Sequence, residues 1–163
     1  MTNSTAPQGS TTSIVKCAFY GRSATLLKGR DSIEHQLAAC RECAKAKGWV
    51  ILEEHLYTDE GKSGTSLHNR PGLDQLLAAA KSKTRPFAAV LFADISRLSR
   101  NGMDIIRVSD KLLTHGVCCY FVGSQLDSQA ERYKLVLSTI EQYGAHRLKN
   151  KVEARHHKGR IRK

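Results

Sequence analysis

The sequence predicts an α/β domain with an open, mostly parallel sheet of four to five strands, flanked by helices and followed by a long C-terminal helix. Short apolar runs, bounded by glycines or polar residues, alternate with longer segments whose apolar positions recur at helical spacing. Strands and helices that alternate in this way form βαβ units, which build parallel sheets. A chain of 163 residues has room for one such domain.

The first half of the chain divides into two strands, two helices and their loops. Ser32 is a plausible N-cap for the first helix, and Gly48 can end it. Pro71 suits the first turn of the second helix. Both strands are short apolar runs of the kind that parallel sheets bury. In order, we expect strand 14–20, loop 21–31, helix 33–47, strand 49–57, loop 58–70 and helix 71–83.

The second half repeats the pattern and ends in the long helix. An apolar stripe that includes Leu135 and Ile140 runs along this helix and fades where basic residues begin. In order, we expect strand 87–93, loop 94–101, helix 102–115, strand 117–122 and a helix from 128 onward. The chain thus divides into a flexible start (1–13), a globular body (14–127), the long helix (128–155) and a basic segment (156–163).

Basic charge is concentrated near the C-terminus. The chain has 26 Lys and Arg against 15 Asp and Glu, a formal net charge of +11 at pH 7. Between 145 and 163, Glu153 is the one acidic residue. This distribution is typical of a polyanion binder, although a solubilising tail or a cut inside a longer protein would look the same. The candidate contact residues are Arg147, Lys149, Lys151, Arg155, Lys158 and Arg160.

Membrane, secreted and disulfide-rich classes are disfavoured. No apolar run reaches the roughly 18 residues of a membrane-spanning helix, and the Ser/Thr-rich start does not resemble a secretion signal. Cys118 and Cys119 lie in an apolar run, and Cys40 and Cys43 share one helix face. This pattern favours buried packing over disulfide, zinc or redox roles. We therefore expect a cytoplasmic protein with no membrane partner.

Arginine occurs in each of the three loops that follow parallel strands, where ligand sites of such sheets gather. The guanidinium fork suits phosphate oxygens, and several together can stabilise the extra charge of a phosphoryl transfer. A solvated surface charge is the alternative for each arginine taken alone. The candidate phosphate-binding arginines are Arg22, Arg70, Arg97 and Arg100.

Metal and nucleotide chemistry are less well supported. The carboxylates near these loops, Asp59, Glu60 and Asp94, lie close to basic side chains, whereas a two-metal centre needs several carboxylates at one site. The phosphate-binding motif GxxxxGK[ST] does not occur. Phosphoryl transfer here would rely on arginines and a side-chain nucleophile.

Five short motifs follow one another along the chain: Tyr-x-Arg at 20–22, SIEHQ at 32–36, DEGKSG at 59–64, NRPGL at 69–73 and SRLSR at 96–100. This ordered set resembles the catalytic domain of the serine recombinases, the resolvase/invertase group, and the large serine integrases in particular. The resemblance spans about residues 16–158.

The resemblance implies site-specific DNA recombination on a resolvase-like fold. In this family a serine two residues beyond the Tyr-x-Arg arginine attacks a DNA phosphodiester, forming a 5′-phosphoserine link and releasing a 3′-hydroxyl that later reseals the DNA. No metal, ATP or other cofactor is implied. The site residues carried over are Tyr20, Arg22, position 24, Gln36, Arg70, Ser96, Arg97 and Arg100.

The resemblance also implies partners and a setting. Double-stranded DNA is the substrate, and the protein forms a homodimer that becomes a tetramer in the synaptic complex, in the cytoplasm of a prokaryote. The long helix would form the dimer interface and pass its basic end along the minor groove. Family members continue into C-terminal DNA-binding domains, so we expect this chain to be the catalytic part of such a protein.

The sequence departs from the family at two positions. Ala24 stands where the nucleophilic serine is expected, and a methyl group cannot attack phosphorus. An engineered Ser→Ala change, a naturally silent relative, or a shifted nucleophile at Ser23 or Thr25 would account for it. Ser23 fits least, because neighbouring side chains of an extended segment point to opposite sides. Ser96 stands where many members have aspartate.

With Ala24 in place, the first interpretation is a recombinase domain that does not cleave DNA. The sequence is also compatible with two other functions. A non-catalytic DNA-binding or assembly module is favoured by Ala24 and disfavoured by the retained arginines. A metal-free, phosphatase-like hydrolase would need a nucleophile at a strand end and gives the basic tail no role.

Overall fold

One five-stranded sheet organises the structure, a computed structural model that describes residues 14–24, 32–131, 133, 135, 138 and 139. Its strands are β1 Lys16–Arg22, β2 Val50–Asp59, β3 Ala89–Phe92, β4 Cys118–Phe121 and β5 Leu126–Asp127. The strand order is β2-β1-β3-β4-β5; the first four are parallel, and β5 runs antiparallel to β4. The predicted fold class is confirmed.

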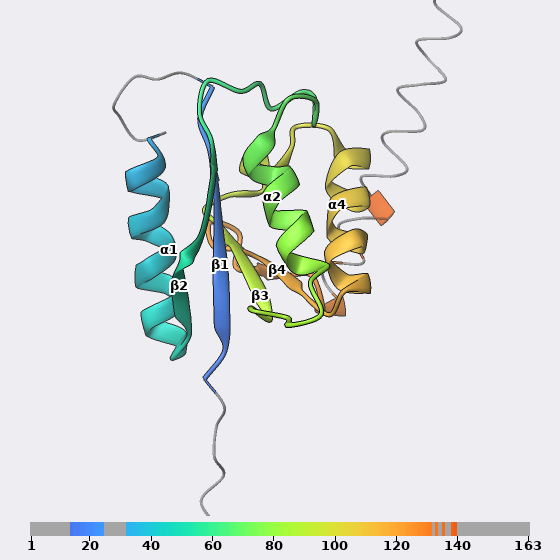
Figure 1. The fold of residues 1–163 in the computed structure, drawn as a ribbon. Coiled ribbons are helices and arrows are strands. Elements are labelled where there is room, and N and C mark those ends of the chain that lie inside the picture. Colours follow the sequence, from blue (N-terminus) through green and yellow to red (C-terminus); the bar gives the residue numbers. More distant parts are fainter. Residues whose placement is uncertain (1–13, 25–31, 132, 134, 136–137, 140–163) are drawn as a thin grey trace, which may run out of the picture.

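Helices cover both faces of the sheet. Within the described residues they are α1 Ile33–Lys47, α2 Pro71–Ala80, α3 Ile95–Leu98 and α4 Gly102–Thr114. α1 lies on one side of the sheet, and α2 and α4 lie on the other (Figure 1). Phe19 and Cys40 belong to the core beneath α1, whereas Tyr20 and Leu76 belong to the core beneath α2 and α4. Because both faces of β1 are buried, its residues 17–20 are apolar without alternation.

The ends of α1 follow the local signals. The Ser32 hydroxyl accepts a hydrogen bond from the backbone N–H of His35 at 3.2 Å. Gly48 adopts a φ of 67°, and its N–H donates to the carbonyls of Ala44 and Lys45. A left-handed backbone favours glycine, so both predicted boundaries are confirmed.

The strand ends differ from the expectation. β1 continues to Arg22 and β2 to Asp59, two residues beyond each predicted end, because the two strands stay paired up to these residues. Backbone pairing, which the apolar pattern does not report, therefore decides where they stop. The predicted loop 94–101 holds the short helix α3, which Asp94 caps by accepting from the Ser96 N–H at 2.9 Å. The apolar pattern also does not predict the short antiparallel strand β5.

The described residues after β5 agree with a helix at Glu131, Tyr133, Leu135, Ser138 and Thr139. Tyr133 is buried and its hydroxyl donates to Ser109 Oγ at 2.5 Å, which docks this segment on α4. Leu135 is 68% exposed. The rest of the predicted helix 128–155, the segments 1–13 and 156–163, and the six candidate polyanion contacts lie outside the described residues.

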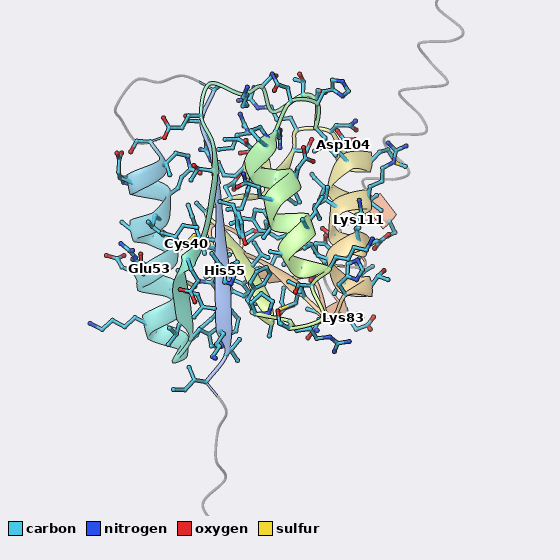
Figure 2. All side chains as sticks on the ribbon, viewed as in Figure 1. Cys40, Glu53, His55, Lys83, Asp104 and Lys111 are labelled. Carbon is cyan, nitrogen blue, oxygen red and sulfur yellow. The ribbon has the colours of Figure 1, made fainter. Side chains whose placement is uncertain are left out.

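The cysteines occupy apolar surroundings. Cys40 lies between α1 and the sheet (Figure 2), and burial raises its pKa to about 12. Burial likewise raises the pKa of Cys17 and of Cys119 to about 12, so these thiols stay protonated and poorly nucleophilic. Among the described helices, none has the length and apolar character to cross a bilayer.

The start of α2 takes its cap from another element. Its N-cap residue, Arg70, makes no side-chain capping bond, and the first helical residue is a proline without an N–H. Asp59, at the end of β2, accepts instead from the N–H groups of Gly72 and Leu73 at 2.9 and 3.0 Å. The same carboxylate accepts from the Tyr20 hydroxyl at 2.8 Å. Asp59 thus connects the start of α2 to β1 and β2.

Replacing Asp59 by alanine should lower the free energy of unfolding by about 3 kcal/mol or more. Three buried donors would be left without their acceptor, and each such change costs roughly 1–3 kcal/mol. Urea unfolding measures the effect, with the exposed neighbour Glu60→Ala as control. A decrease below about 1 kcal/mol in Asp59→Ala would show that these hydrogen bonds do not hold α2 in place.

Candidate active site

Two of the predicted arginines are buried completely. Arg22 closes β1 and is 1% exposed, and Arg70 immediately precedes α2 and is 0% exposed. Arginine is almost never fully buried without partners. The alternative of a solvated surface charge therefore does not hold for either residue.

Carbonyl oxygens of two loops hold both guanidinium groups. Arg22 donates to the carbonyls of Lys62, at 2.7 Å, and Ser96, at 3.1 Å. Arg70 donates to the carbonyls of Ser63, at 2.9 Å, and Leu98. Each arginine therefore joins the loop after β2 to the segment after β3.

The described residues place no carboxylate side chain in ion-pair contact with these two guanidinium groups. Within the described residues, neither Arg22 nor Arg70 forms a salt bridge with a carboxylate. The Nε–H donors of both side chains are buried and make no hydrogen bond. A buried cation without a counter-ion is costly, and an anion supplied from outside would offset that cost.

The other two arginines lie at the same place. The Arg97 side chain is partly buried and donates to the Arg22 carbonyl at 3.4 Å. Arg100 is exposed, and its backbone N–H donates to the Gly64 carbonyl at 2.8 Å. Burial, and then repulsion from Arg70, Arg97 and Arg100, lowers the pKa of Arg22. The other three guanidinium groups thus lie close enough to act on Arg22, and we call the four together the arginine cluster.

Tyr20 and Gln36 are buried polar residues that adjoin the arginine cluster. Burial and its hydrogen bond to Asp59 raise the pKa of Tyr20, so the phenol stays protonated and donates to that carboxylate. The Gln36 amide is buried; its Oε1 accepts from the Arg22 N–H at 3.2 Å and its Nε2 donates to the Arg22 carbonyl at 3.0 Å. Gln36 therefore fixes the backbone from which Arg22 projects.

The residues after Arg22 differ in exposure. Ser23 is 3% exposed; its N–H donates to the Asp59 carbonyl and its own carbonyl accepts from the Lys62 N–H. Ala24, the next residue, is exposed. Thr25 lies outside the described residues. Of the two described positions, only 24 presents its side chain to solvent beside the arginine cluster.

Ser96 and Asp94 shape the segment that carries Arg97. The Ser96 carbonyl accepts from Arg22, and its N–H donates to Asp94. Burial alone would raise the pKa of Asp94, but hydrogen bonds from Ser96 and the charge of Arg97 lower it below its ordinary value. Asp94 is therefore ionised, and it accepts its hydrogen bonds from within the fold. No group of three or more His, Cys, Asp or Glu in the described residues is placed to hold a metal ion.

Hydrogen bonds or electrostatic interactions bring together seven of the sequence-predicted site residues at the carboxyl end of β1: Tyr20, Arg22, Gln36, Arg70, Ser96, Arg97 and Arg100. The eighth position, Ala24, follows that strand by two residues. Sequence reasoning considered Asp59 as a metal ligand and placed Asp59 and Gly64 in the DEGKSG motif, but it did not assign either of them the role seen in the structure. A Cβ on Gly64 would lie 2.7 Å from Arg22 Nη2, so this glycine lets the loop pass close over the guanidinium group. The absence of a capping side chain before the α2 proline was the signal that could have indicated Asp59.

Known proteins resemble this chain in sequence and in fold. The family model described as "Resolvase, N terminal domain" matches residues 17–163. No curated protein matches the sequence. The N-terminal catalytic domain of TP901-1 integrase is 25% identical, with a TM-score of 0.68, over 82% of this chain and 97% of that one.

Two further solved structures share the fold. A resolvase family site-specific recombinase from Streptococcus pneumoniae has a TM-score of 0.70 at 24% identity, over 91% of this chain and 97% of that one. The C-terminal catalytic domain of ISC1926 TnpA, an IS607-like serine recombinase, has a TM-score of 0.57 at 24% identity, over 91% of this chain and 100% of that one. At these identities the likeness concerns the fold alone.

The buried and exposed arginines should differ in their effect on stability. Arg70→Ala should lower the free energy of unfolding by about 3 kcal/mol or more, since it removes two charge-assisted hydrogen bonds of roughly 1.5–3 kcal/mol each. Arg100→Ala should change it by no more than about 0.5 kcal/mol, because that side chain is exposed. Urea unfolding of both variants measures the difference. Equal decreases in the free energy of unfolding would contradict the distinction between a buried, structural Arg70 and an exposed Arg100.

Proposed function

The chain belongs to the resolvase N-terminal domain family, and on that premise we propose that it is the catalytic domain of a site-specific serine recombinase that acts on double-stranded DNA. The observation that carries the proposal is the arginine cluster, which gathers four guanidinium groups near position 24. In the part of the chain that the structure describes, no carboxylate forms a salt bridge with Arg22 or Arg70. The likeness to the TP901-1 integrase catalytic domain supports the same assignment.

The proposed chemistry is a reversible transfer of a DNA phosphoryl group to a serine at position 24. The serine oxygen bonds to phosphorus and loses its proton to solvent, while the bond from phosphorus to the 3′ oxygen breaks and that oxygen gains a proton. The DNA keeps a 5′-phosphoserine link until the 3′-hydroxyl of the partner strand attacks back. The arginine cluster supplies fixed positive charge where the transition state gathers negative charge.

Position 24 is alanine in this chain, so we propose that it holds DNA without cutting it. Ser23 is a poor substitute nucleophile because it is 3% exposed and its backbone is paired on both sides. One of Arg97 and Arg100 would help to protonate the leaving oxygen, although arginine is a weak acid at neutral pH.

Assembly and DNA docking complete the proposal. We expect a homodimer that forms a tetramer in the synaptic complex, with the basic positions between 145 and 163 on the DNA backbone. A non-catalytic DNA-docking module on the same fold is the second candidate, and Ala24 is the observation that favours it. The two candidates differ in whether a hydroxyl at position 24 produces cleavage.

Ala24→Ser should give the chain the ability to bond covalently to DNA. End-labelled duplex DNA that shifts to a protein-linked band on a denaturing gel measures this, and the unaltered chain should give no such band. Ser23→Ala in the Ala24→Ser chain is the matched control and should keep the band. If Ala24→Ser forms no adduct while folding normally, the docking module becomes the better account.

Neutralising the basic segment should weaken DNA binding and flatten its dependence on salt. Log K falls as log salt rises, and each protein–phosphate ion pair that the substitutions remove makes this slope shallower by roughly 0.9. The variant carries glutamine at Arg147, Lys149, Lys151 and Arg155, and binding is followed by fluorescence anisotropy over a range of salt. An unchanged slope would show that these residues do not bind the DNA backbone.

A further inference from the structure

Ser99 is a buried residue of the SRLSR motif, between the buried Leu98 and the exposed Arg100. It ends α3, is 1% exposed, and directly precedes Arg100. Its hydroxyl oxygen accepts from the N–H of Asn101, the N-cap of α4, at 3.0 Å. The hydroxyl also lies 3.2 Å from the Gly64 carbonyl, to which it donates. One hydroxyl group therefore touches both α4 and the loop after β2.

Three successive carbonyls of that loop are bound by the arginine cluster and by Ser99. The Lys62 carbonyl accepts from Arg22, and the Ser63 carbonyl accepts from Arg70. The Gly64 carbonyl accepts both from the backbone N–H of Arg100 and from the Ser99 hydroxyl. Ser99 is the one uncharged side chain, among the described residues, that takes part in this set of bonds.

Asp104 extends the contact into α4. Figure 2 shows it at the end of α4 that faces the loops, and it is 8% exposed. Its Oδ2 lies 3.4 Å from Ser99 Oγ, slightly farther than the Gly64 carbonyl. The Ser99 proton thus has two acceptors within reach, one on a rigid helix and one on the loop that covers Arg22.

We propose that Ser99 is a positioning residue for the arginine cluster: by fixing Gly64 and the backbone of Arg100 to the start of α4, it sets where the Arg100 guanidinium meets a phosphate. This inference rests on the proposed function for the identity of that phosphate, a DNA phosphodiester. Ser99 itself is buried and does not touch the phosphate. Removing the hydroxyl leaves the Asn101 N–H without its acceptor and the Gly64 carbonyl with one donor in place of two.

The first test needs no cleavage. Inorganic phosphate is titrated into the chain as it stands, and the arginine Nε–H resonances are followed by NMR. Ser99→Ala should weaken phosphate binding by at least about twofold. Ser109→Ala is the matched control, because Ser109 is also a buried serine whose hydroxyl is hydrogen-bonded, but it lies within α4 and bonds to Tyr133. This control should reduce stability to a similar degree and leave phosphate binding unchanged.

The second test measures adduct formation in the Ala24→Ser chain. Adding Ser99→Ala should slow the rate at saturating DNA by about tenfold to a hundredfold, as small displacements of a catalytic group do, with little change in DNA affinity. Ser99→Thr, which keeps a hydroxyl, should recover the rate. Adding Ser109→Ala should leave the rate unchanged.

The outcomes separate the two proposals. Phosphate binding that is the same in Ser99→Ala and in the parent chain overturns the positioning role, and so does equal weakening in Ser99→Ala and Ser109→Ala. If Ala24→Ser forms no adduct in any background, the proposed function fails. The phosphate titration still decides the role of Ser99 in that case.

Discussion

Two buried guanidinium groups, those of Arg22 and Arg70, hold together the loops on which the candidate site is built. They bridge carbonyls of residues 62 and 63 to carbonyls of residues 96 and 98. Charge-assisted bonds to carbonyls offset part of the cost of burial, but a carbonyl brings no negative charge. The fold therefore carries excess positive charge at the edge where ligands of parallel sheets bind. Folding and anion binding rest on the same side chains.

Much of this arrangement follows from local sequence, and the remainder follows from contacts that local sequence does not report. The caps of α1 and the alternation of strands and helices were predicted because they depend on nearest neighbours. The convergence of the four arginines follows from parallel topology alone. The burial of Arg22 and Arg70 could not be predicted, since arginine is normally exposed. Nor could the role of Asp59, which caps a helix that begins 12 residues later in the chain only because the end of β2 meets the start of α2.

The same bonds explain why the site tolerates an alanine at position 24. Arg22 is held by Gln36 and by loop carbonyls, and Ser23 by the backbone of the loop after β2; none of these bonds uses the side chain of Ala24. Under the proposed function, Ala24 removes the nucleophile and leaves the arginine cluster assembled. This separation of positioning from attack is what allows the recombinase and the docking module to share one fold.

In the proposed function, the arginine cluster receives a DNA phosphate beside position 24. A crystal structure of the chain bound to duplex DNA tests it most directly, because Ala24 should leave the duplex intact. We expect one backbone phosphate within hydrogen-bonding distance of the Arg97 and Arg100 guanidinium groups, with Cβ of Ala24 facing phosphorus on the side opposite the 3′ oxygen. DNA bound solely through other basic residues, with no phosphate at the arginine cluster, would contradict the account.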